Sequence, residues 1–271
     1  MNNLSKKKLT NQEQFVKNHH KHHHQVAIYR ILIFVLFLTL WEASVFFGWI
    51  DAFFFASPSR VVLCFLDMTL HKSLFMHIGI TLLETLVSFL LVLFISLIVA
   101  TLLWYSGKLS EVLEPYLVIL NSLPKSALAP LFIVWLGTGM TTIIVAGISV
   151  AVFGSIISFY TAFRQISNEK ITLIYTLGGN KQHAFSKVVL PGCVPTLIST
   201  AKVNIGLALV GVIIGEFLAA RRGLGYLIIY GSQVFQLNMV ITSIILLCII
   251  AMGFYKAIQG IEHYIKKKIS S

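Results

Sequence analysis

A series of long apolar runs constrains this chain more than any other feature of its sequence. About 20 apolar residues, at a rise of about 1.5 Å each, carry a helix across the hydrocarbon core of a bilayer. We therefore predict an all-α membrane protein with six transmembrane helices. The predicted helices are Ile28–Ile50, Ile78–Tyr105, Leu113–Leu136, Thr141–Phe163, Val194–Ala219 and Val240–Ile261.

Composition agrees with a chain that lives in lipid. Charged residues make up 11%, hydrophobic residues 57%, and the mean hydropathy is +0.85, whereas soluble domains carry about a quarter charged residues. The pI near 9.6 arises from lysines and arginines in loops and tails, which is the pattern of membrane topology rather than of a nucleic-acid-binding face. The three cysteines have no CxxC spacing, so we expect neither a zinc site nor a disulfide framework.

The distribution of Lys and Arg predicts the orientation. Cytoplasmic segments of membrane proteins are enriched in these residues. With the N-terminus inside, the outer segments hold four of them (Arg60, Lys72, Arg221 and Arg222), and the inner segments hold most of the others. We therefore expect a multi-pass protein of the cell membrane with both termini in the cytoplasm.

The chain divides into a tail, 1–27, and a transmembrane domain, 28–271. The tail is basic and histidine-rich, and we expect it to be disordered in the cytoplasm. Its histidine run would allow weak metal binding, because imidazole is a common metal ligand. A solvated low-complexity tail is the simpler interpretation, since nothing nearby supplies the supporting partners of a built site. The histidines concerned are His19, His20, His22, His23 and His24.

Two places combine apolar surroundings with charge. In the third run, Pro124, Lys125 and Pro130 interrupt the helix where lipid cannot satisfy freed backbone groups, which indicates a translocation pathway or, equally, a kink with the lysine reaching an interface. A cation there would suit an anionic substrate. Glu216 either pairs locally with Arg221 or serves as an outer gate or docking point on that pathway.

The inner loop 164–190 is predicted to form two short helices. Ser167 begins the first helix, and Gly178 ends it in a left-handed conformation near Leu177. A second helix then leads towards Pro191. Leu173, Ile174 and Leu177 share one face of the first helix, and this face must bury itself against a partner or against the protein's own helices.

Catalytic motifs are missing from the sequence. It contains no G-x-x-x-x-G-K-[ST], HExxH or GxSxG pattern, so we expect no enzymatic activity, no cofactor in this chain, and energy from a partner. The alternative is an ion-coupled secondary transporter that needs no ATPase. That class shows internal repeats with paired broken helices, and here we find one broken helix and no repeat.

The spacing in the inner loop resembles a known motif. Gly178 is followed by nine residues, Val188, one residue, Leu190 and Pro191. This is similar to the cytoplasmic loop of ATP-binding-cassette (ABC) importer permeases, although Thr172, Leu173 and Ile174 stand where that family has Glu-Ala-Ala. Three further segments resemble nitrate/sulfonate/taurine-type permeases, and the likeness extends over about 55–266. The segments are Phe55–Val61, Leu120–Gly137 and Gly215–Leu227.

The resemblance implies a type I ABC importer permease fold and a transported small solute. Nitrate, sulfonates and taurine, the first two of them anions, and thiamine-like pyrimidines are all open as that solute. The resemblance also implies bacterial origin, pairing with a second permease, an extracytoplasmic solute-binding protein, and ATPase subunits that bind ATP and Mg. Loop 164–190 would be the element that couples to the ATPase. The residues that the resemblance places in this role are Thr172, Leu173, Ile174, Leu177, Gly178, Val188, Leu190 and Pro191.

Overall fold

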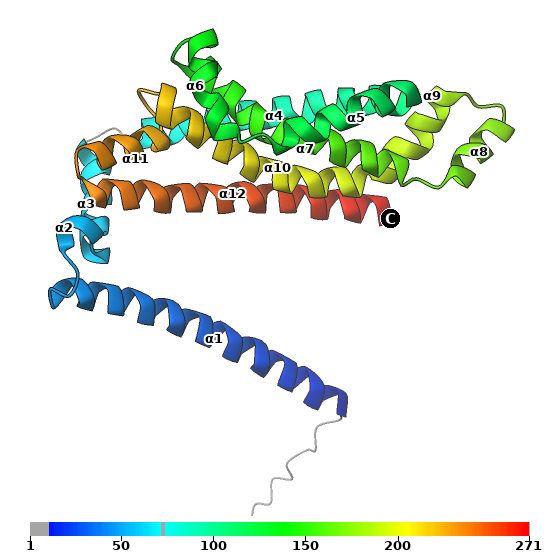
Figure 1. The fold of residues 1–271 in the computed structure, drawn as a ribbon. Coiled ribbons are helices and arrows are strands. Elements are labelled where there is room, and N and C mark those ends of the chain that lie inside the picture. The colour runs from blue at the N-terminus through cyan, green and yellow to red at the C-terminus, as the bar shows by residue number, and fades with distance from the viewer. Residues whose placement is uncertain (1–10, 72–73, 271) are drawn as a thin grey trace, which may run out of the picture. The chain divides into compact units, whose positions relative to one another are not determined.

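A computed structural model describes residues 11–71 and 74–270, and in these residues it contains helices and no strand (Figure 1). The elements are α1 (Asn11–Phe46), α2 (Ala52–Phe55), α3 (Pro58–His71), α4 (Leu74–Tyr105), α5 (Gly107–Ser122), α6 (Lys125–Leu136), α7 (Met140–Arg164), α8 (Asn168–Thr176), α9 (Lys181–Ala184), the π-helical turn η1 (Phe185–Val189), α10 (Leu190–Ala219), α11 (Leu224–Gln233) and α12 (Leu237–Ser270).

Five stretches within the described helices are long and apolar enough to cross a membrane, and they lie in α1, α4, α7, α12 and the continuous run from α9 to α10. Two further helices, α5 and α6, pass the same test together; they meet at an angle of 96° and form either a broken span or a re-entrant loop. The prediction of an all-α membrane protein is confirmed. The third predicted span is a bent pair rather than one helix.

The bend has a local cause at Leu123 and Pro124. Proline restricts the residue before it to extended conformations and lacks an N–H for the helix. Leu123 accordingly leaves the helix at φ −63° and ψ 140°. Pro124 then becomes the N-cap residue of α6.

The chain forms two compact units, residues 1–63 and 64–271. The first unit contains α1 and α2. The described residues 11–27, which the sequence predicts as an unstructured tail, belong to α1. The start of α3 is capped within this unit, because Glu42 accepts hydrogen bonds from Ser59 N (3.0 Å) and Ser59 Oγ (2.7 Å).

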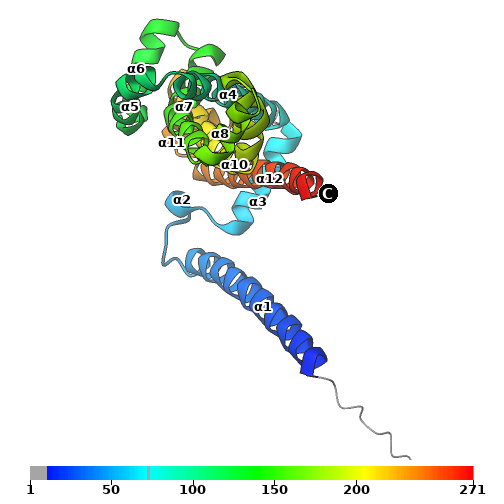
Figure 2. The same cartoon turned by 90° about the vertical axis from the view of Figure 1, so that its right-hand side faces the viewer.

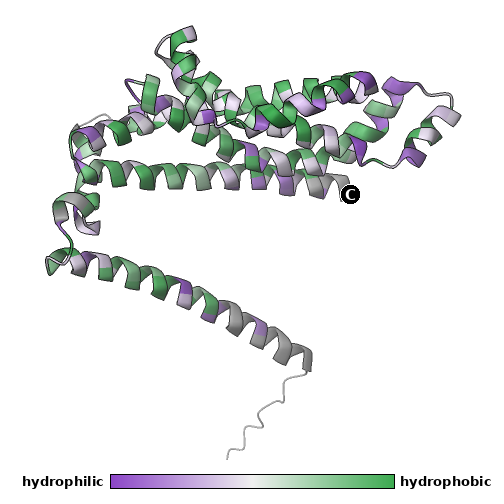
Figure 3. Cartoon of the chain, in the orientation of Figure 1, coloured by the Kyte–Doolittle hydropathy of each residue, from purple (hydrophilic) through white to green (hydrophobic). Residues whose placement is uncertain are grey.

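In the second unit, α10 packs on α7, α4, α11 and α12. Figure 2 looks along these helices, with α5 and α6 to one side and α12 to another. Figure 3 shows apolar residues along the helices and hydrophilic ones gathered at the α8–α9 end. The described side chains of α4, α7 and α10 bury an apolar core near that end.

Glycines bring α7 and α10 into close contact. A Cβ atom on Gly211 would lie 2.7 Å from Gly147 Cα, and one on Gly215 would lie 2.9 Å from Ile143 Cα. Gly211 and Gly215 form a GxxxG pair on α10, a spacing that lets helix backbones approach within a membrane. In lipid the hydrophobic effect does not drive helices together, so such close packing is a main source of association.

We predict that Gly211→Ala lowers stability by about 1–3 kcal/mol, because the added methyl group must push two backbones apart. The matched control is Gly206→Ala on the same helix, where a Cβ meets nothing within 4 Å. Thermal unfolding of the purified protein in detergent measures both. Equal midpoints for the two variants would contradict the close α7–α10 contact.

Candidate coupling surface

The corner between α8 and α9 is built on a glycine pair. Gly178 has φ +80°, a left-handed conformation that glycine adopts without strain. Its N–H donates to Tyr175 O at 3.0 Å, and Gly179 N–H donates to Ile174 O at 2.8 Å. The sequence-based prediction that Gly178 ends the first short helix is confirmed. Ser167 occupies the N-cap position but makes no side-chain capping bond.

Asn180 starts the second short helix with a reciprocal cap. Asn180 Oδ1 accepts a hydrogen bond from His183 N at 2.9 Å, and Asn180 N donates to His183 Nδ1 at 3.3 Å. This arrangement satisfies backbone N–H groups that have no partner within the helix. It fixes the direction in which α9 leaves the corner.

The connection from α9 to the membrane is continuous. The sequence predicts a short helix, Lys181–Val189, that stops before Pro191. The structure instead continues through η1 into α10, with Pro191 at the first positions of α10. The π turn lies just before the proline, whose ring and missing N–H interrupt regular α-helical hydrogen bonding. Val188 and Leu190 are half-buried there.

The apolar face of α8 is shared between the protein and its surroundings. Ile174 is half-buried and packs against Gly179, where a Cβ would lie 2.5 Å from Ile174 Cγ2. Leu173 and Leu177 are 57% and 74% exposed, and Thr172 is exposed beside them. Exposed apolar side chains grouped on a hydrophilic projection are typical of a protein-binding surface.

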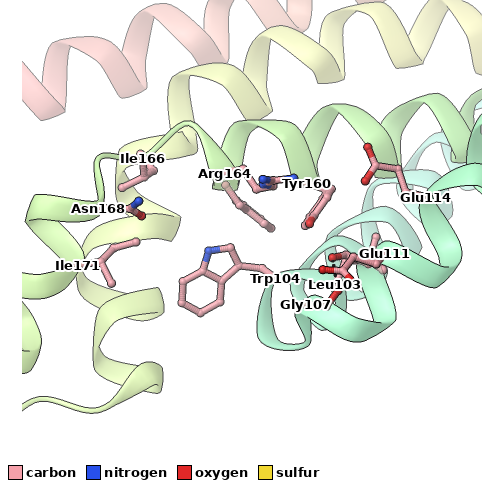
Figure 4. Close-up of a pocket in the computed structure, with 12 residues that line it drawn as sticks. Leu103, Trp104, Gly107, Glu111, Glu114, Tyr160, Arg164, Ile166, Asn168 and Ile171 are labelled. Atoms are coloured by element: carbon pink, nitrogen blue, oxygen red, sulfur yellow. Dashed lines mark hydrogen bonds between the residues drawn. The ribbon is translucent and has the colours of Figure 1, made fainter.

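A pocket of about 360 Å³ lies next to α8 (Figure 4). It is lined by the ends of α4 and α7, the start of α5, and α8. Its walls are polar and of mixed charge, because Glu111 and Glu114 of α5 line it together with Arg164 of α7 and the ring of Trp104. The pocket belongs to the same end of the bundle as the exposed leucines.

The predicted pathway residues lie at the bend between α5 and α6 and on α10. Lys125 Nζ donates to Leu120 O, and it lies 5.4 Å from the centre of the Phe153 ring. The first residue of α6 thus caps a carbonyl group near the C-terminal end of α5, on the other side of the bend. Pro124 and Pro130 are exposed. Their place on a pathway stays a prediction.

Glu216, by contrast, is fully buried. Its carboxylate accepts hydrogen bonds from Thr81 Oγ1 (2.6 Å) and Gly225 N (2.5 Å). These contacts differ from the local pair with Arg221, which is one of the two interpretations that the sequence allows. The buried carboxyl group of Glu84 lies close to that of Glu216.

The turn before α11 is tied to α4 by the same group of residues. Leu224 N donates to Thr81 Oγ1 at 2.8 Å, and Gly223 N donates to His77 Nδ1 at 3.0 Å. Sequence reasoning missed the roles of Thr81 and His77. Thr81, Glu84, Thr85 and Ser88 recur at helical spacing within an apolar helix, and that polar stripe was the available signal.

Lys202 forms a second polar link between helices. Its ammonium group pairs with Glu262, which joins α10 to α12. Both side chains are largely buried. A paired charge of this kind avoids the cost of leaving a lone ion in lipid.

Comparison with known families now identifies the class. Residues 92–270 match the family described as "Binding-protein-dependent transport system inner membrane component". The match covers more than half of the chain, which therefore belongs to this family of ABC transporter permeases. The inference of a multi-pass membrane transport protein is confirmed, and these matches lend no support to the ion-coupled alternative.

Three curated relatives align over most of their length. A probable ABC transporter permease of Haemophilus influenzae is 30% identical over 86% of this chain and 94% of its own. The formylaminopyrimidine transport permease ThiX of Halalkalibacterium halodurans is 24% identical (88% and 94%). The putative aliphatic sulfonates transport permease SsuC of Bacillus subtilis is 26% identical (81% and 80%). These relatives agree with the predicted sulfonate/taurine-type resemblance.

Solved structures show the same fold. A chain of the methionine ABC transporter MetNI, described as inward facing, superposes with a TM-score of 0.63 and 23% identity, covering 71% of this chain and 95% of that one. The predicted type I ABC importer permease fold is confirmed by this likeness.

We predict that Gly223→Ala destabilises the protein by about 1–3 kcal/mol. Gly223 has φ +117°, and an added Cβ would overlap the Glu216 carboxyl group. Gly79→Ala, on α4 with nothing within 4 Å of the added atom, is the control. Thermal unfolding in detergent reports both changes. A Gly223→Ala protein as stable as the control would show that this turn is not tied to Glu216.

Proposed function

We propose that this chain is the substrate-translocating permease of an ABC importer and that the segment 164–190 is its ATPase-coupling element. The observation that carries the proposal is the exposed pair Leu173 and Leu177, held on a short helix at the hydrophilic end of the bundle. A groove on a partner ATPase would bury these leucines. The partner would bind ATP and Mg, because this sequence has no nucleotide-binding motif.

The proposal also covers the wider assembly. The permease would work in a pair, with a second copy or a related chain, and an extracytoplasmic binding protein would deliver the solute. The distribution of Lys and Arg supports cytoplasmic termini, which puts the α8–α9 corner on the ATPase side. Relatives come from the bacteria Haemophilus influenzae and Bacillus subtilis, which supports a bacterial cell membrane as the location of this protein.

Closure of two ATPases on ATP would move the paired α8–α9 corners and rock the helices between two states. The corner suits this role because both of its short helices have fixed ends. Gly178 and Gly179 close α8, and the Asn180–His183 cap opens α9. A displacement of α8 by the partner would therefore reach α9 through the short connection of residues 178–180.

Substitution of Gly178 tests the coupling element. We expect Gly178→Val to reduce uptake and ATPase co-purification, because a β-branched residue at positive φ costs about 1–3 kcal/mol and would distort the corner. Gly178→Asn should retain both, since asparagine tolerates this conformation. Space is not the issue, because a Cβ at Gly178 meets nothing within 4 Å. Unchanged uptake and ATPase binding in the valine variant would sink the assignment.

The solute is proposed to be small and anionic, of the sulfonate class. The name of the SsuC relative supports sulfonates, and the name of ThiX supports a pyrimidine as a second candidate. Direct binding of alkanesulfonates and formylaminopyrimidines to the cognate binding protein distinguishes the two. Binding of pyrimidines alone would overturn the anionic class.

We expect Lys125→Ala to lower sulfonate uptake at saturating binding protein while ATPase co-purification persists. The substitution removes both a cation near the predicted pathway and the contact that closes the α5–α6 bend. Lys125→Arg, which keeps the charge and the ring contact, is the matched variant. Normal uptake by Lys125→Ala would remove this lysine from the transport mechanism.

A further inference from the structure

Lys181, the first residue of α9, is engaged by the end of α4. Its ammonium group donates to Tyr105 O at 2.7 Å. It also lies 5.5 Å from the centre of the Trp104 ring and 5.8 Å from the centre of the Tyr105 ring. One side chain of the α8–α9 corner thus makes three contacts with a helix that is 76 residues away in sequence.

The position of Tyr105 at the end of α4 explains why a cation is favoured beside it. Tyr105 is the last residue of α4, and the final carbonyl groups of a helix have no partner within it. These carbonyls carry the negative end of the helix dipole, so a cation beside them is favoured. The faces of Trp and Tyr rings attract cations by their quadrupoles as well. Lys181 therefore caps α4 from another element.

An aromatic cluster lies next to Lys181 and joins η1 to the ends of α4 and α7. The ring centre of Phe185, in η1, lies 5.1 Å from that of Trp104, 5.6 Å from that of Tyr105 and 5.4 Å from that of Phe163. Phe163 is near the end of α7 and is 1% exposed. Aromatic pairs at these separations stabilise by more than the area they bury. The segment after Gly178 is thus fixed to both α4 and α7.

The two sides of the corner differ in how they meet the protein. The α8 side presents Leu173 and Leu177 outward, whereas the α9 side is held by Lys181 and Phe185 against the ends of two membrane helices. A partner that binds the outward face would therefore act on α4 and α7 through the inward contacts. Lys181 contacts α4 and not the outward face of α8. Its removal should therefore weaken the transmission of movement to α4 while the docking of the partner is retained.

We propose that Lys181 is the positioning residue that links the coupling corner to α4, so that movement imposed on α8 by a partner ATPase reaches α4 and α7. The inference rests on the proposed function, because it needs an ATPase that docks at this corner. Lys181 is assigned no contact with the ATPase or the solute. Its removal should uncouple hydrolysis from transport rather than abolish assembly.

The test uses the whole transporter in proteoliposomes, that is, the permease with its ATPase and solute-binding protein. Three quantities are measured: co-purification of the ATPase, ATP hydrolysis stimulated by loaded binding protein, and solute uptake. The variants are Lys181→Met, which keeps the length of the side chain, and Lys181→Arg, which keeps the cation and the donor groups. Lys108→Met is the control, because Lys108 is an exposed lysine at the same end of the bundle on α5.

We expect Lys181→Met to keep ATPase co-purification and to keep hydrolysis within about twofold, while uptake per ATP hydrolysed falls about fivefold or more, as loss of a charge-assisted hydrogen bond and two ring contacts predicts. Lys181→Arg should restore most of the uptake, and Lys108→Met should behave as the unsubstituted protein.

Two results would overturn the inference. Unchanged uptake per ATP in Lys181→Met would show that the joint does not need the lysine. Parallel loss of co-purification and hydrolysis in that variant would show that Lys181 serves docking or folding. Failure of the unsubstituted permease to retain an ATPase would instead overturn the proposed function and the inference together, and this outcome is recognised without any variant.

Discussion

The structure depends on the close contact between α7 and α10. In lipid, burial of apolar surface offers little drive for helices to associate, so backbones must approach closely enough for dispersion contacts to accumulate. Gly147, Gly211 and Gly215 permit that approach. The contact places α4 beside both helices, and it thereby sets the positions of the two polar assemblies that close the bundle at opposite ends of α4 and α10.

One assembly ties the turn before α11 to α4. Glu216 is fully buried, yet it accepts hydrogen bonds from the Thr81 hydroxyl group and from the backbone N–H of Gly225. A buried carboxyl group is tolerable in such a setting because its hydrogen-bonding capacity is met. The glycines of the turn are required on steric grounds, since a side chain at Gly223 or Gly225 would occupy the space of the carboxyl group.

The other assembly lies at the α8–α9 end, where polar and apolar groups have separate tasks. Leu173 and Leu177 remain outward and available to a partner, whereas Phe185 and Lys181 hold the corner to α4 and α7. An exposed face on one side and an anchored face on the other are what a mechanical coupling element requires. The family match gives such an element its context, because the family consists of binding-protein-dependent transport components, and this sequence contains no nucleotide-binding motif of the kind sought.

The sequence by itself determined the membrane class, the approximate bounds of the five long apolar helices, the break at Pro124 and the glycine that ends α8. Each of these follows from local properties: apolar length, the missing N–H of proline and the conformational freedom of glycine. The tertiary structure decided which polar residues meet. Thr81 and Glu216 are 135 residues apart, and Lys181 and Tyr105 are 76 apart. Such pairings arise only once α4, α7 and α10 have packed, because no local pattern in the chain specifies which helix faces which.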